Sequence, residues 1–264
     1  MTKDPSKWAI VTGASKGLGY HTARALVDEG FNLVLFSRNK QRLIETITEL
    51  KKYRYDNLLI LGVPGDLRSP EDIDRLFKET YSYTDKIDYL FISYGNPICE
   101  PSRIPEVPWS CWLEATSLYL ASTHRLLRNL IMYNNGRTRV LVFNSFTITS
   151  PGHELLTVAD AVRRGLSLLL KRTAYSYPSK LMIIEARFGS MKTPGAEETI
   201  RLVSRLQGID PREVWKLIRE KMTSLKRLAS YDDVLALIRT LVALPEYTVY
   251  TVLNIDGGSE NIVC

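Results

Sequence analysis

Short apolar runs alternate with longer amphipathic segments along the whole sequence. Runs rich in β-branched residues predict strands at 8–12, 32–36, 57–62, 89–93, 139–144, 181–188 and 250–255. Apolar residues at helical spacing predict helices at 18–29, 40–52, 71–83, 111–134, 156–176, 196–206, 211–222 and 231–244. Most of the predicted strands lack polar alternation, which is typical of strands that helices cover on both faces. The alternation therefore predicts an α/β fold with a doubly wound parallel sheet and helices on both faces.

Some of the predicted helices carry start signals of their own. Ser69 precedes Pro70 and two acids, and Asp210 precedes a second proline with Glu213 at capping-box spacing. No linker, low-complexity tract or internal repeat interrupts the pattern. We therefore expect residues 1–264 to form a single domain.

The composition narrows the class of protein. The chain has 264 residues, of which 45% are hydrophobic and 24% charged, as in an ordinary soluble domain. No apolar run approaches the ~20 residues that cross a membrane, so we expect no membrane partner. Residues 1–7 are polar and lead directly into the first apolar run, without the central apolar stretch of a signal peptide. These features predict a cytoplasmic protein.

The cysteines and the charge are consistent with that location. Cys99, Cys111 and Cys264 are widely spaced and suggest neither a metal site nor a redox pair, so we expect three reduced thiols. The 35 basic and 29 acidic residues give a net charge of +6, but the basic residues are dispersed rather than gathered in a stripe. We therefore expect no nucleic-acid partner, and we attribute the excess charge to an anionic cofactor or substrate.

A glycine-rich loop, residues 12–19 (TGASKGLG), lies between the first predicted strand and the first predicted helix. In this context Gly13 suits a tight turn, Gly17 the close approach of the backbone to a pyrophosphate, and Gly19 the packing of helix on strand. The pyrophosphate would lie on the amides of the helix N-terminus. The loop therefore predicts a Rossmann-type dinucleotide site rather than a turn without a ligand.

The sequence resembles the short-chain dehydrogenase/reductase family, and the likeness extends over the whole chain. Residues 12–19 are similar to the family's T-G-x-x-x-G-x-G fingerprint. Asp66, which is followed by Leu67, resembles the family's acid after the third strand, which holds the adenine. Residues 93–95 stand where the family has N-A-G, although only Gly95 is retained.

Two later segments add to the resemblance. Phe188-Gly189, followed by Thr193, is similar to the P-G-x-x-x-T stretch that contacts the nicotinamide end of the cofactor. Residues 254–258 resemble the V-D-G-G sequence that ends the family's last strand. The resemblance implies a nicotinamide dinucleotide cofactor and oxidoreductase activity.

The end of the second predicted strand bears on the type of cofactor. Sites specific for NAD place a carboxylate there to bind the ribose 2′-hydroxyl. This chain instead has Ser37 followed by Arg38, and Lys16 lies in the glycine-rich loop. Two cations favour a 2′-phosphate and hence NADP(H) over NAD(H), unless both are solvated surface charges. The residues expected to hold the cofactor are Gly13, Ser15, Lys16, Gly17, Leu18, Gly19, Ser37, Arg38, Asp66, Leu67, Gly95, Gly189 and Thr193.

The catalytic set that the resemblance implies is incomplete. The family uses a serine that orients the substrate, a tyrosine that donates the proton and a lysine four residues later. Ser145, at the end of the fifth predicted strand, matches the serine, although a serine there also suits a turn or a cap. Counting forward from Ser145 and backward from Phe188 places the tyrosine at Val158 and the lysine at Val162. Neither valine has a proton to give.

Other residues are candidates to assist Ser145. Thr116 or Ser117 falls where the family has the asparagine that anchors a relay water. His153 titrates near neutrality and would serve as an acid, unless it is only a solvated loop residue. Arg163 would lie near the nicotinamide ribose after a one-residue slip of register, but as part of an exposed helix face with Arg164 it would have no such role.

Two functions follow from these features. The first is an NADP(H)-dependent oxidoreductase that transfers hydride between the nicotinamide and a carbonyl or secondary alcohol, with an atypical active site. The alternative is a catalytically inactive member that binds NADP(H) as a sensor, scaffold or partner subunit. The resemblance also implies a homodimer or homotetramer formed through the helices predicted at 111–134 and 156–176, and a segment near 190–222 that covers the substrate.

Overall fold

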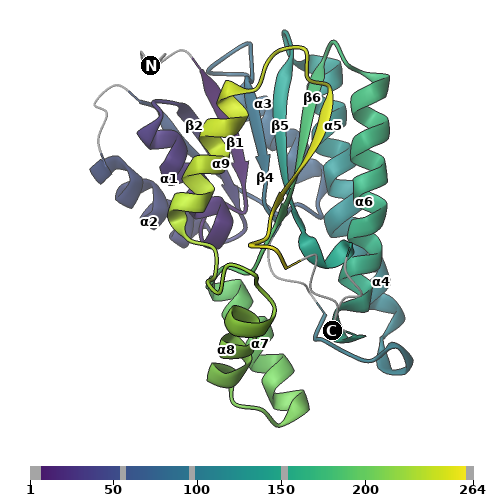
Figure 1. The fold of residues 1–264 in the computed structure, drawn as a ribbon. Coiled ribbons are helices and arrows are strands. Elements are labelled where there is room, and N and C mark those ends of the chain that lie inside the picture. The colour runs from purple at the N-terminus through teal and green to yellow at the C-terminus, as the bar shows by residue number, and fades with distance from the viewer. Residues whose placement is uncertain (1–6, 54–57, 95–98, 150–153, 260–264) are drawn as a thin grey trace.

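The strands of the computed structural model, which describes residues 7–53, 58–94, 99–149 and 154–259, form one parallel sheet. The strands run in the order β3-β2-β1-β4-β5-β6-β7 (Figure 1). Their bounds are β1 (Trp8–Thr12), β2 (Asn32–Ser37), β3 (Ile60–Pro64), β4 (Tyr89–Ile92), β5 (Thr138–Ser145), β6 (Leu181–Phe188) and β7 (Tyr250–Ile255). This arrangement confirms the predicted doubly wound sheet. The order reverses between β1 and β4, and α/β sheets bind ligands beyond the carboxyl ends of the strands at such a reversal.

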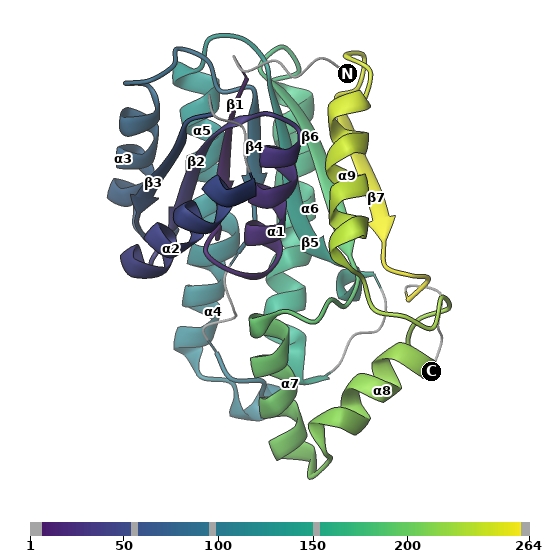
Figure 2. The same ribbon diagram turned by 90° about the vertical axis from the view of Figure 1, so that its left-hand side faces the viewer.

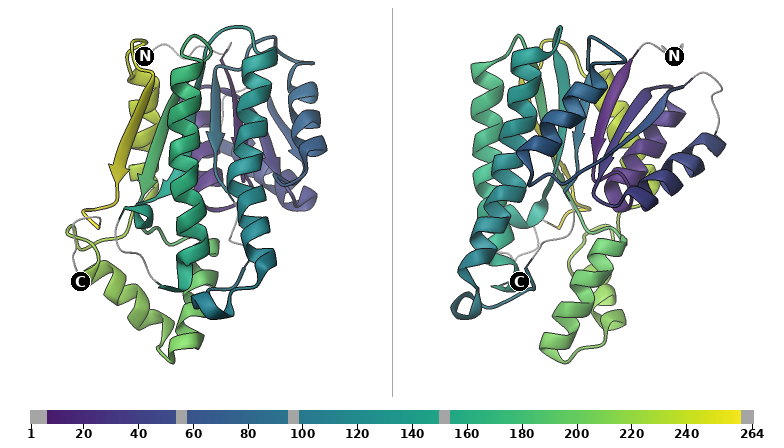
Figure 3. Two further views of the ribbon diagram at one scale, coloured as in Figure 1. Left: turned by 90° about the vertical axis from the view of Figure 1, so that its right-hand side faces the viewer. Right: turned by 180° about the vertical axis from the view of Figure 1, so that it is seen from behind.

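Helices cover both faces of the sheet. One face carries α1 (Gly17–Asp28), α2 (Lys40–Leu50) and α9 (Tyr231–Ala243), which face the viewer in Figure 2. The other carries α3 (Pro70–Thr80), α4 (Trp109–Thr116), α5 (Ser122–Tyr133) and α6 (Thr157–Ser176), of which α5 and α6 are in front in the left view of Figure 3. Two further helices, α7 (Pro194–Gln207) and α8 (Pro211–Lys221), project beyond the carboxyl ends of the strands (Figure 1).

Alternate residues of each central strand enter two separate apolar clusters, one on each face of the sheet. In β1, Ile10 packs with the α3, α5 and α6 side, whereas Ala9 and Val11 pack with the α1, α2 and α9 side. Because both faces are covered, the strands read as continuous apolar runs, which is why the sequence predicted them well.

Some boundaries differ from the prediction. The third strand covers Ile60–Pro64 rather than 57–62, because the residues that pair with β2 begin at Ile60. The helix predicted at 111–134 begins earlier, at Trp109, and contains a π-helical turn, η3 (Ser117–Ala121), between α4 and α5. A π-helical turn accommodates an extra residue in the helix, and such turns are frequent at functional sites.

The prediction of three reduced thiols is wrong for two of the cysteines. A disulfide joins Cys99 to Cys111, whose Cα atoms lie 5.6 Å apart. The loop after β4 makes a 3-10 turn, η2 (Ile104–Glu106), and returns to the start of α4, which brings the two cysteines together. Their separation in the sequence did not indicate this, and Cys264 lies outside the described residues. Within the described part of the chain, no helix is long and apolar enough to cross a membrane.

Candidate active site

The glycine-rich loop after β1 is built so that only glycine fits at its key positions. Gly13 and Gly17 have φ values of +61° and +58°, in the left-handed region that favours glycine. A Cβ on Gly13 would lie 2.6 Å from the carbonyl oxygen of Ser93, and one on Gly19 would lie 2.3 Å from the carbonyl oxygen of Gly13. The loop is thus a close-packed backbone cradle whose geometry requires glycine at these positions.

The start of α1 is open to an anion. Within the described residues, this helix has no side-chain cap at Lys16 and no acid in its first turn, whereas Thr193 caps α7 and Asp210 caps α8. The first amides of a helix have no partner inside the helix, and together with the helix dipole they attract negative charge. The cradle and the uncapped helix therefore fit the pyrophosphate of a dinucleotide.

A threonine fixes the loop to the neighbouring strand. Thr12 Oγ1 donates to the carbonyl oxygen of Ser93 at 3.0 Å and accepts from the Ser93 amide at 3.1 Å. These two bonds join the carboxyl ends of β1 and β4 at the reversal of strand order. The Thr12 side chain is fully buried, so the loop leaves the sheet at a rigid point.

The end of β2 has the polar groups expected of the adenosine end of the site. Ser37 Oγ lies 2.7 Å from Ser15 Oγ of the loop, and the next residue, Arg38, is exposed. Asp66, after β3, forms an ion pair with Arg68 at 2.6 Å. Burial alone would raise the pKa of Asp66, but the hydrogen bonds and charge of Arg68, together with the charge of Arg38, lower it. Asp66 is therefore an ionised carboxylate among cations.

The segment after β6 meets the glycine-rich loop. A Cβ on Gly17 would lie 3.5 Å from Thr193 Cβ, so these predicted site residues are neighbours. Gly189 packs against the backbone of Asp256, where an added Cβ would lie 2.8 Å from the Asp256 Cα. A hollow of about 380 Å³ borders Gly189 and is also lined by Arg227, Asp233 and residues 254–258. The segment that resembles the family's nicotinamide contacts, 188–193, thus lies beside the segment that resembles the end of the family's last strand, 254–258.

Ser145 stands at the carboxyl end of β5, opposite Phe188 of β6. Its Oγ lies 2.8 Å from Thr147 Oγ1, which in turn donates to Asp160 Oδ1 at 2.6 Å. Burial raises the pKa of Asp160, although the hydrogen bond from Thr147 and the charge of Arg163 oppose the shift. The sequence prediction missed Thr147 and Asp160. Asp160 stands between the two valines, in the helix whose face at Arg163 and Arg164 was considered exposed.

Asn144, the residue before Ser145, anchors the end of β5 to a buried carboxylate. Its Nδ2 donates to Glu185 Oε1 at 3.1 Å, and Ser167 Oγ and Tyr250 OH donate to the same carboxyl group at 2.7 and 2.6 Å. Glu185 is fully buried and is also paired with Arg187 at 3.2 Å. This network holds the strand that presents Ser145.

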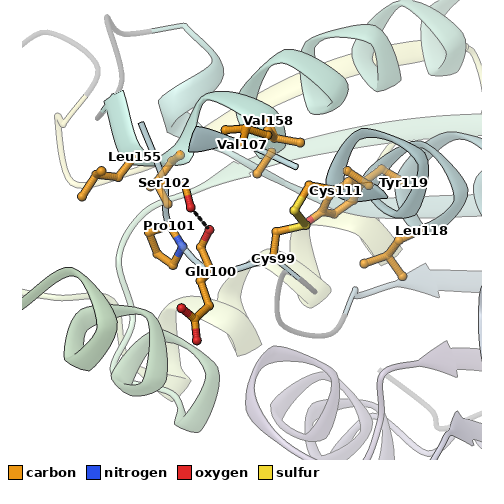
Figure 4. Close-up of a pocket in the computed structure, with 13 residues that line it drawn as sticks. Cys99, Glu100, Pro101, Ser102, Val107, Cys111, Leu118, Tyr119, Leu155 and Val158 are labelled. Carbon is orange, nitrogen blue, oxygen red and sulfur yellow. Dashed lines mark hydrogen bonds between the residues drawn. A yellow bond between two sulfur atoms is a disulfide. The ribbon is translucent and has the colours of Figure 1, made fainter. Parts of the chain in front are cut away.

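Apolar side chains surround the two positions expected for the family's tyrosine and lysine. Val162 is buried in the core at 7% exposure, and Val158 is half-buried. Val158 lines a small cavity of about 40 Å³ together with Tyr119, Leu155 and the disulfide of Cys111. In Figure 4, Tyr119, Cys111 and Val158 lie toward one end of this cavity and Leu155 toward the other.

Arg163 does not lie on an exposed helix face with Arg164, which corrects that interpretation. Its guanidinium lies over the ring of Tyr119, 4.6 Å from the centroid, and its Nη2 donates to Tyr119 OH at 3.2 Å. Tyr119 is only 1% exposed and packs edge-on against Tyr94 at the end of β4. Arg164 is exposed and donates to the carbonyl oxygen of Ile148. Arg163 therefore points into the molecule, where its guanidinium is stabilised by the ring and the hydroxyl group of Tyr119.

The remaining predicted site residues are placed as follows. Thr116 ends α4 and is exposed, and Ser117 begins the π-helical turn. Leu67 is buried, and Leu18, within the glycine-rich loop, is half-buried. His153 and Gly95 lie outside the described residues. Among the residues that the structure describes, no group of three or more His, Cys, Asp and Glu side chains could hold a metal ion.

Known proteins are similar to this chain in sequence. The family model for short chain dehydrogenase matches residues 7–150. An uncharacterized oxidoreductase, YvaG of Bacillus subtilis, is 26% identical over 195 residues, covering 72% of this chain and 70% of YvaG. The 11-beta-hydroxysteroid dehydrogenase-like 2 protein of Arabidopsis thaliana is 34% identical over 91 residues, or 34% of this chain. The matched part spans only 29% of that plant protein and 35% of the matching Caenorhabditis elegans protein, dehydrogenase/reductase SDR family member 4.

Solved structures show the same fold over the whole chain. A tryptophan variant of actinorhodin polyketide ketoreductase with NADPH has a TM-score of 0.88 at 21% identity, covering 99% of this chain and all of that chain. The L-sorbose reductase of Gluconobacter frateurii, in complex with NADPH and L-sorbose, has a TM-score of 0.86 at 22% identity, covering 98% of both chains. The sheet order, the glycine cradle and the family match over more than half of the sequence agree. This chain belongs to the short-chain dehydrogenase family.

Proposed function

We propose that this protein is an NADP(H)-dependent oxidoreductase that transfers hydride between the nicotinamide and a carbonyl or a secondary alcohol. The observation that carries the proposal is the cradle of Gly13, Gly17 and Gly19 in front of an uncapped α1, which fits a dinucleotide pyrophosphate. Thr193 beside Gly17 places a hydroxyl at the same loop. The two structural neighbours above are described as NADPH complexes, which supports the choice of cofactor.

The preference for NADP(H) over NAD(H) rests on the end of β2. Ser37 stands where a carboxylate would select NAD, and the exposed Arg38 follows it. Lys16, at the start of α1, adds a second cation. A 2′-phosphate gains charge-assisted hydrogen bonds from such groups, each worth about 1.5–3 kcal/mol.

When bound, the cofactor supplies the hydride, and the residues of this chain position the other reactant. Ser145, at the carboxyl end of β5, donates a hydrogen bond to the substrate oxygen. The disulfide-linked loop at Cys111 and the cavity beside Val158 present an apolar wall, which favours a substrate whose carbonyl carries apolar groups. The helices α7 and α8 beyond the carboxyl ends of the strands cover the substrate.

A second function is favoured by the apolar surroundings of Val158 and Val162. Neither side chain donates a proton, and losing a general acid costs about 10²–10⁴ in rate. The alternative is therefore a catalytically inactive member that binds NADP(H) as a sensor, scaffold or partner subunit. This alternative predicts saturable binding of NADPH without turnover.

The test is NADPH oxidation followed by its ultraviolet absorbance with a panel of ketones and aldehydes, run in parallel with NADH and with the Ser145→Ala variant. The proposal expects at least one substrate to be reduced, faster with NADPH than with NADH, and a loss of about 10²-fold or more in Ser145→Ala. Binding of NADPH with no turnover across the panel establishes the inactive alternative. If neither dinucleotide binds at micromolar concentration, both functions are wrong.

The assembly of the protein is part of the same proposal. The helices from Trp109 to Tyr133 and from Thr157 to Ser176 carry exposed apolar residues, including Leu113, Met132 and Leu168, which would be covered in a homodimer or homotetramer. Light scattering after size-exclusion chromatography tests this assembly. A cytoplasmic location also stays a prediction, and the Cys99–Cys111 disulfide argues against it because such bonds are rare in most cytosolic proteins.

A further inference from the structure

An unbroken chain of oxygen atoms leads from the carboxyl end of β5 to the first turn of α6. It starts at Ser145 Oγ, passes through Thr147 Oγ1 at 2.8 Å and ends at Asp160 Oδ1, 2.6 Å further. Thr147 lies in the 3-10 turn η4 (Phe146–Ile148), which starts at Ser145. The amide of Thr147 also donates to Ser145 Oγ at 3.3 Å, so the turn holds the two hydroxyls beside each other.

We propose that Asp160 supplies the proton for carbonyl reduction, through Thr147 and Ser145, in place of the tyrosine that this chain lacks at Val158. The inference rests on the oxidoreductase function proposed above. In this scheme Ser145 touches the substrate and is the catalytic residue. Asp160 and Thr147 act through it and are positioning residues.

The proton balance is complete. The carbonyl carbon gains a hydride from NADPH, the π electrons of the C=O bond move to the oxygen, and that oxygen takes the Ser145 proton. Ser145 regains a proton from Thr147, and Thr147 regains one from Asp160, which is left as a carboxylate. Water reprotonates Asp160 before the next turnover. This relay reverses the hydrogen bond seen with the carboxylate, in which Thr147 donates to Asp160. The protonated carboxyl group donates to Thr147 Oγ1, and Thr147 donates to Ser145 Oγ. Hydroxyl hydrogens rotate, so the same three heavy-atom positions serve both directions of donation.

The surroundings of Asp160 suit a group that must hold a proton. Burial disfavours the carboxylate and raises its pKa, against the opposing effects of Thr147 and Arg163. Arg163 is the neighbouring cation on the same helix, and its guanidinium lies over Tyr119 and donates to that residue's hydroxyl. Thr147, on the facing turn, is uncharged. The Arg163 guanidinium thus interacts with Tyr119, whereas the hydrogen bond of the Asp160 carboxyl group is with the Thr147 hydroxyl.

A competing donor lies in the same region. Tyr119 lines the cavity that contains Val158, and its hydroxyl oxygen accepts from Arg163. This leaves the hydroxyl proton of Tyr119 available to a substrate. No link from Tyr119 to Ser145 is seen among the described residues, whereas the Asp160 chain ends on the serine itself. We therefore propose Asp160 as the source of the proton, and the Tyr119→Phe variant tests the competing donor.

The experiment measures the NADPH-dependent reduction rate against pH for the best carbonyl substrate of the panel. In the wild type, kcat is expected to fall as pH rises above the pKa of Asp160, because the proton donor is lost. Asp160→Asn is expected to lower kcat by about 10²-fold or more and to remove this pH limb, while the Kd for NADPH changes less than about threefold. Asp232→Asn, an exposed acid in the first turn of α9, is the matched control and should keep both rate and profile.

Conservative variants distinguish proton supply from a structural role. Thr147→Val should reproduce most of the loss, and Thr147→Ser, which restores a hydroxyl, should recover the rate and the pH limb. Asp160→Glu should keep a titrating limb at reduced rate. Circular dichroism and NADPH binding show whether each variant is folded, so the serine and glutamate variants keep the test valid if Asn or Val damages the fold.

Each outcome decides the matter. If the wild type turns over and Asp160→Asn keeps the pH limb, or if Tyr119→Phe removes it instead, the assignment to Asp160 is wrong while the oxidoreductase function stands. If the wild type binds NADPH and reduces nothing, the proposed function fails, and the relay fails with it. Loss of the limb in Asp160→Asn with recovery in Thr147→Ser supports the relay.

Discussion

Thr193 stands beside Gly17, close enough that a Cβ on the glycine would lie 3.5 Å from the threonine Cβ. Two segments that are far apart in the sequence thus meet in the candidate cofactor site. Thr193 Oγ1 also accepts from the amide of Ala196 and caps α7. We expect Thr193→Val to weaken NADPH binding about tenfold and to lower the stability by about 1 kcal/mol, because the cap is lost. Thr193→Ser keeps the hydroxyl and should change neither quantity much.

Gly19 tests the cradle directly. In Gly19→Ala the new methyl group would meet the carbonyl oxygen of Gly13 at 2.3 Å, and this contact is to backbone that cannot rotate away. We expect a loss of NADPH binding and a destabilisation of about 1–3 kcal/mol. The matched control is Gly165→Ala on the exposed side of α6, where the methyl group would find Leu120 at an ordinary 3.9 Å. That change should stabilise the protein by about 0.5–1 kcal/mol in urea unfolding. Equal effects of the two substitutions would contradict the cradle.

Arg38 tests the type of cofactor. Arg38→Asp places an acid after Ser37, where it would repel a 2′-phosphate and accept from a ribose hydroxyl. We expect the ratio of the NADPH and NADH dissociation constants to move toward NADH by about tenfold or more. Lys52→Asp, in the turn after α2, makes the same change of charge at an exposed position away from the loop. If Lys52→Asp changed the ratio of the two dissociation constants as much as Arg38→Asp does, the effect would come from net charge alone.

Substitutions of Glu185 test the hydrogen-bond network that holds the end of β5 and Ser145. This fully buried carboxylate accepts from Asn144, Ser167 and Tyr250 and pairs with Arg187. Glu185→Ala removes the buried carboxylate that these groups share, so we expect a loss of about 3–5 kcal/mol. Glu185→Gln keeps one acceptor oxygen and should cost less. A change below about 1 kcal/mol for Glu185→Ala in urea unfolding would show that the network is not structural.

Asp233 makes a prediction about pH. The Arg227 guanidinium, which pairs with it at 2.6 Å, holds its pKa well below the ordinary value of 3.8, and the capping box with Ser230 adds to the effect. A carboxylate with a lowered pKa in the folded state stabilises above its unfolded pKa, and that contribution is lost as the pH falls. Asp233→Asn should cost on the order of 1 kcal/mol at neutral pH. The difference from the wild type should shrink in melting curves below about pH 4. A constant difference at all pH values would exclude the ion pair as its source.

The fold and the cofactor loop could be predicted from the sequence because their signals are local. A strand covered on both faces reads as an apolar run, and Gly13, Gly17 and Gly19 stand within one loop whose geometry only glycine fits. The positions where strands begin and end were harder to predict, because they depend on hydrogen bonding to the neighbouring strand and not on composition. The strand β3 (Ile60–Pro64), which begins where its pairing with β2 begins, is an example.

The catalytic region was harder to predict because its partners are distant in sequence. Arg163 turns inward onto the ring of Tyr119, 44 residues earlier, and nothing near Arg163 in the sequence indicates that ring. Asp160 faces Thr147 only because the turn after β5 brings that hydroxyl to α6. The sequence around Asp160 does not indicate this partner, because Thr147 lies 13 residues earlier and outside the helix. The Cys99–Cys111 bond likewise depends on a loop returning to α4.

The most direct test of the central claim is an equilibrium titration of the protein with NADPH by calorimetry. The account predicts one saturable site per chain with a micromolar or lower Kd, weaker binding of NADH, and loss of the site in Gly19→Ala with retention in Gly165→Ala. If NADPH and NADH both fail to bind the wild type, or if Gly19→Ala binds NADPH as the wild type does, the cofactor site and the function built on it are contradicted.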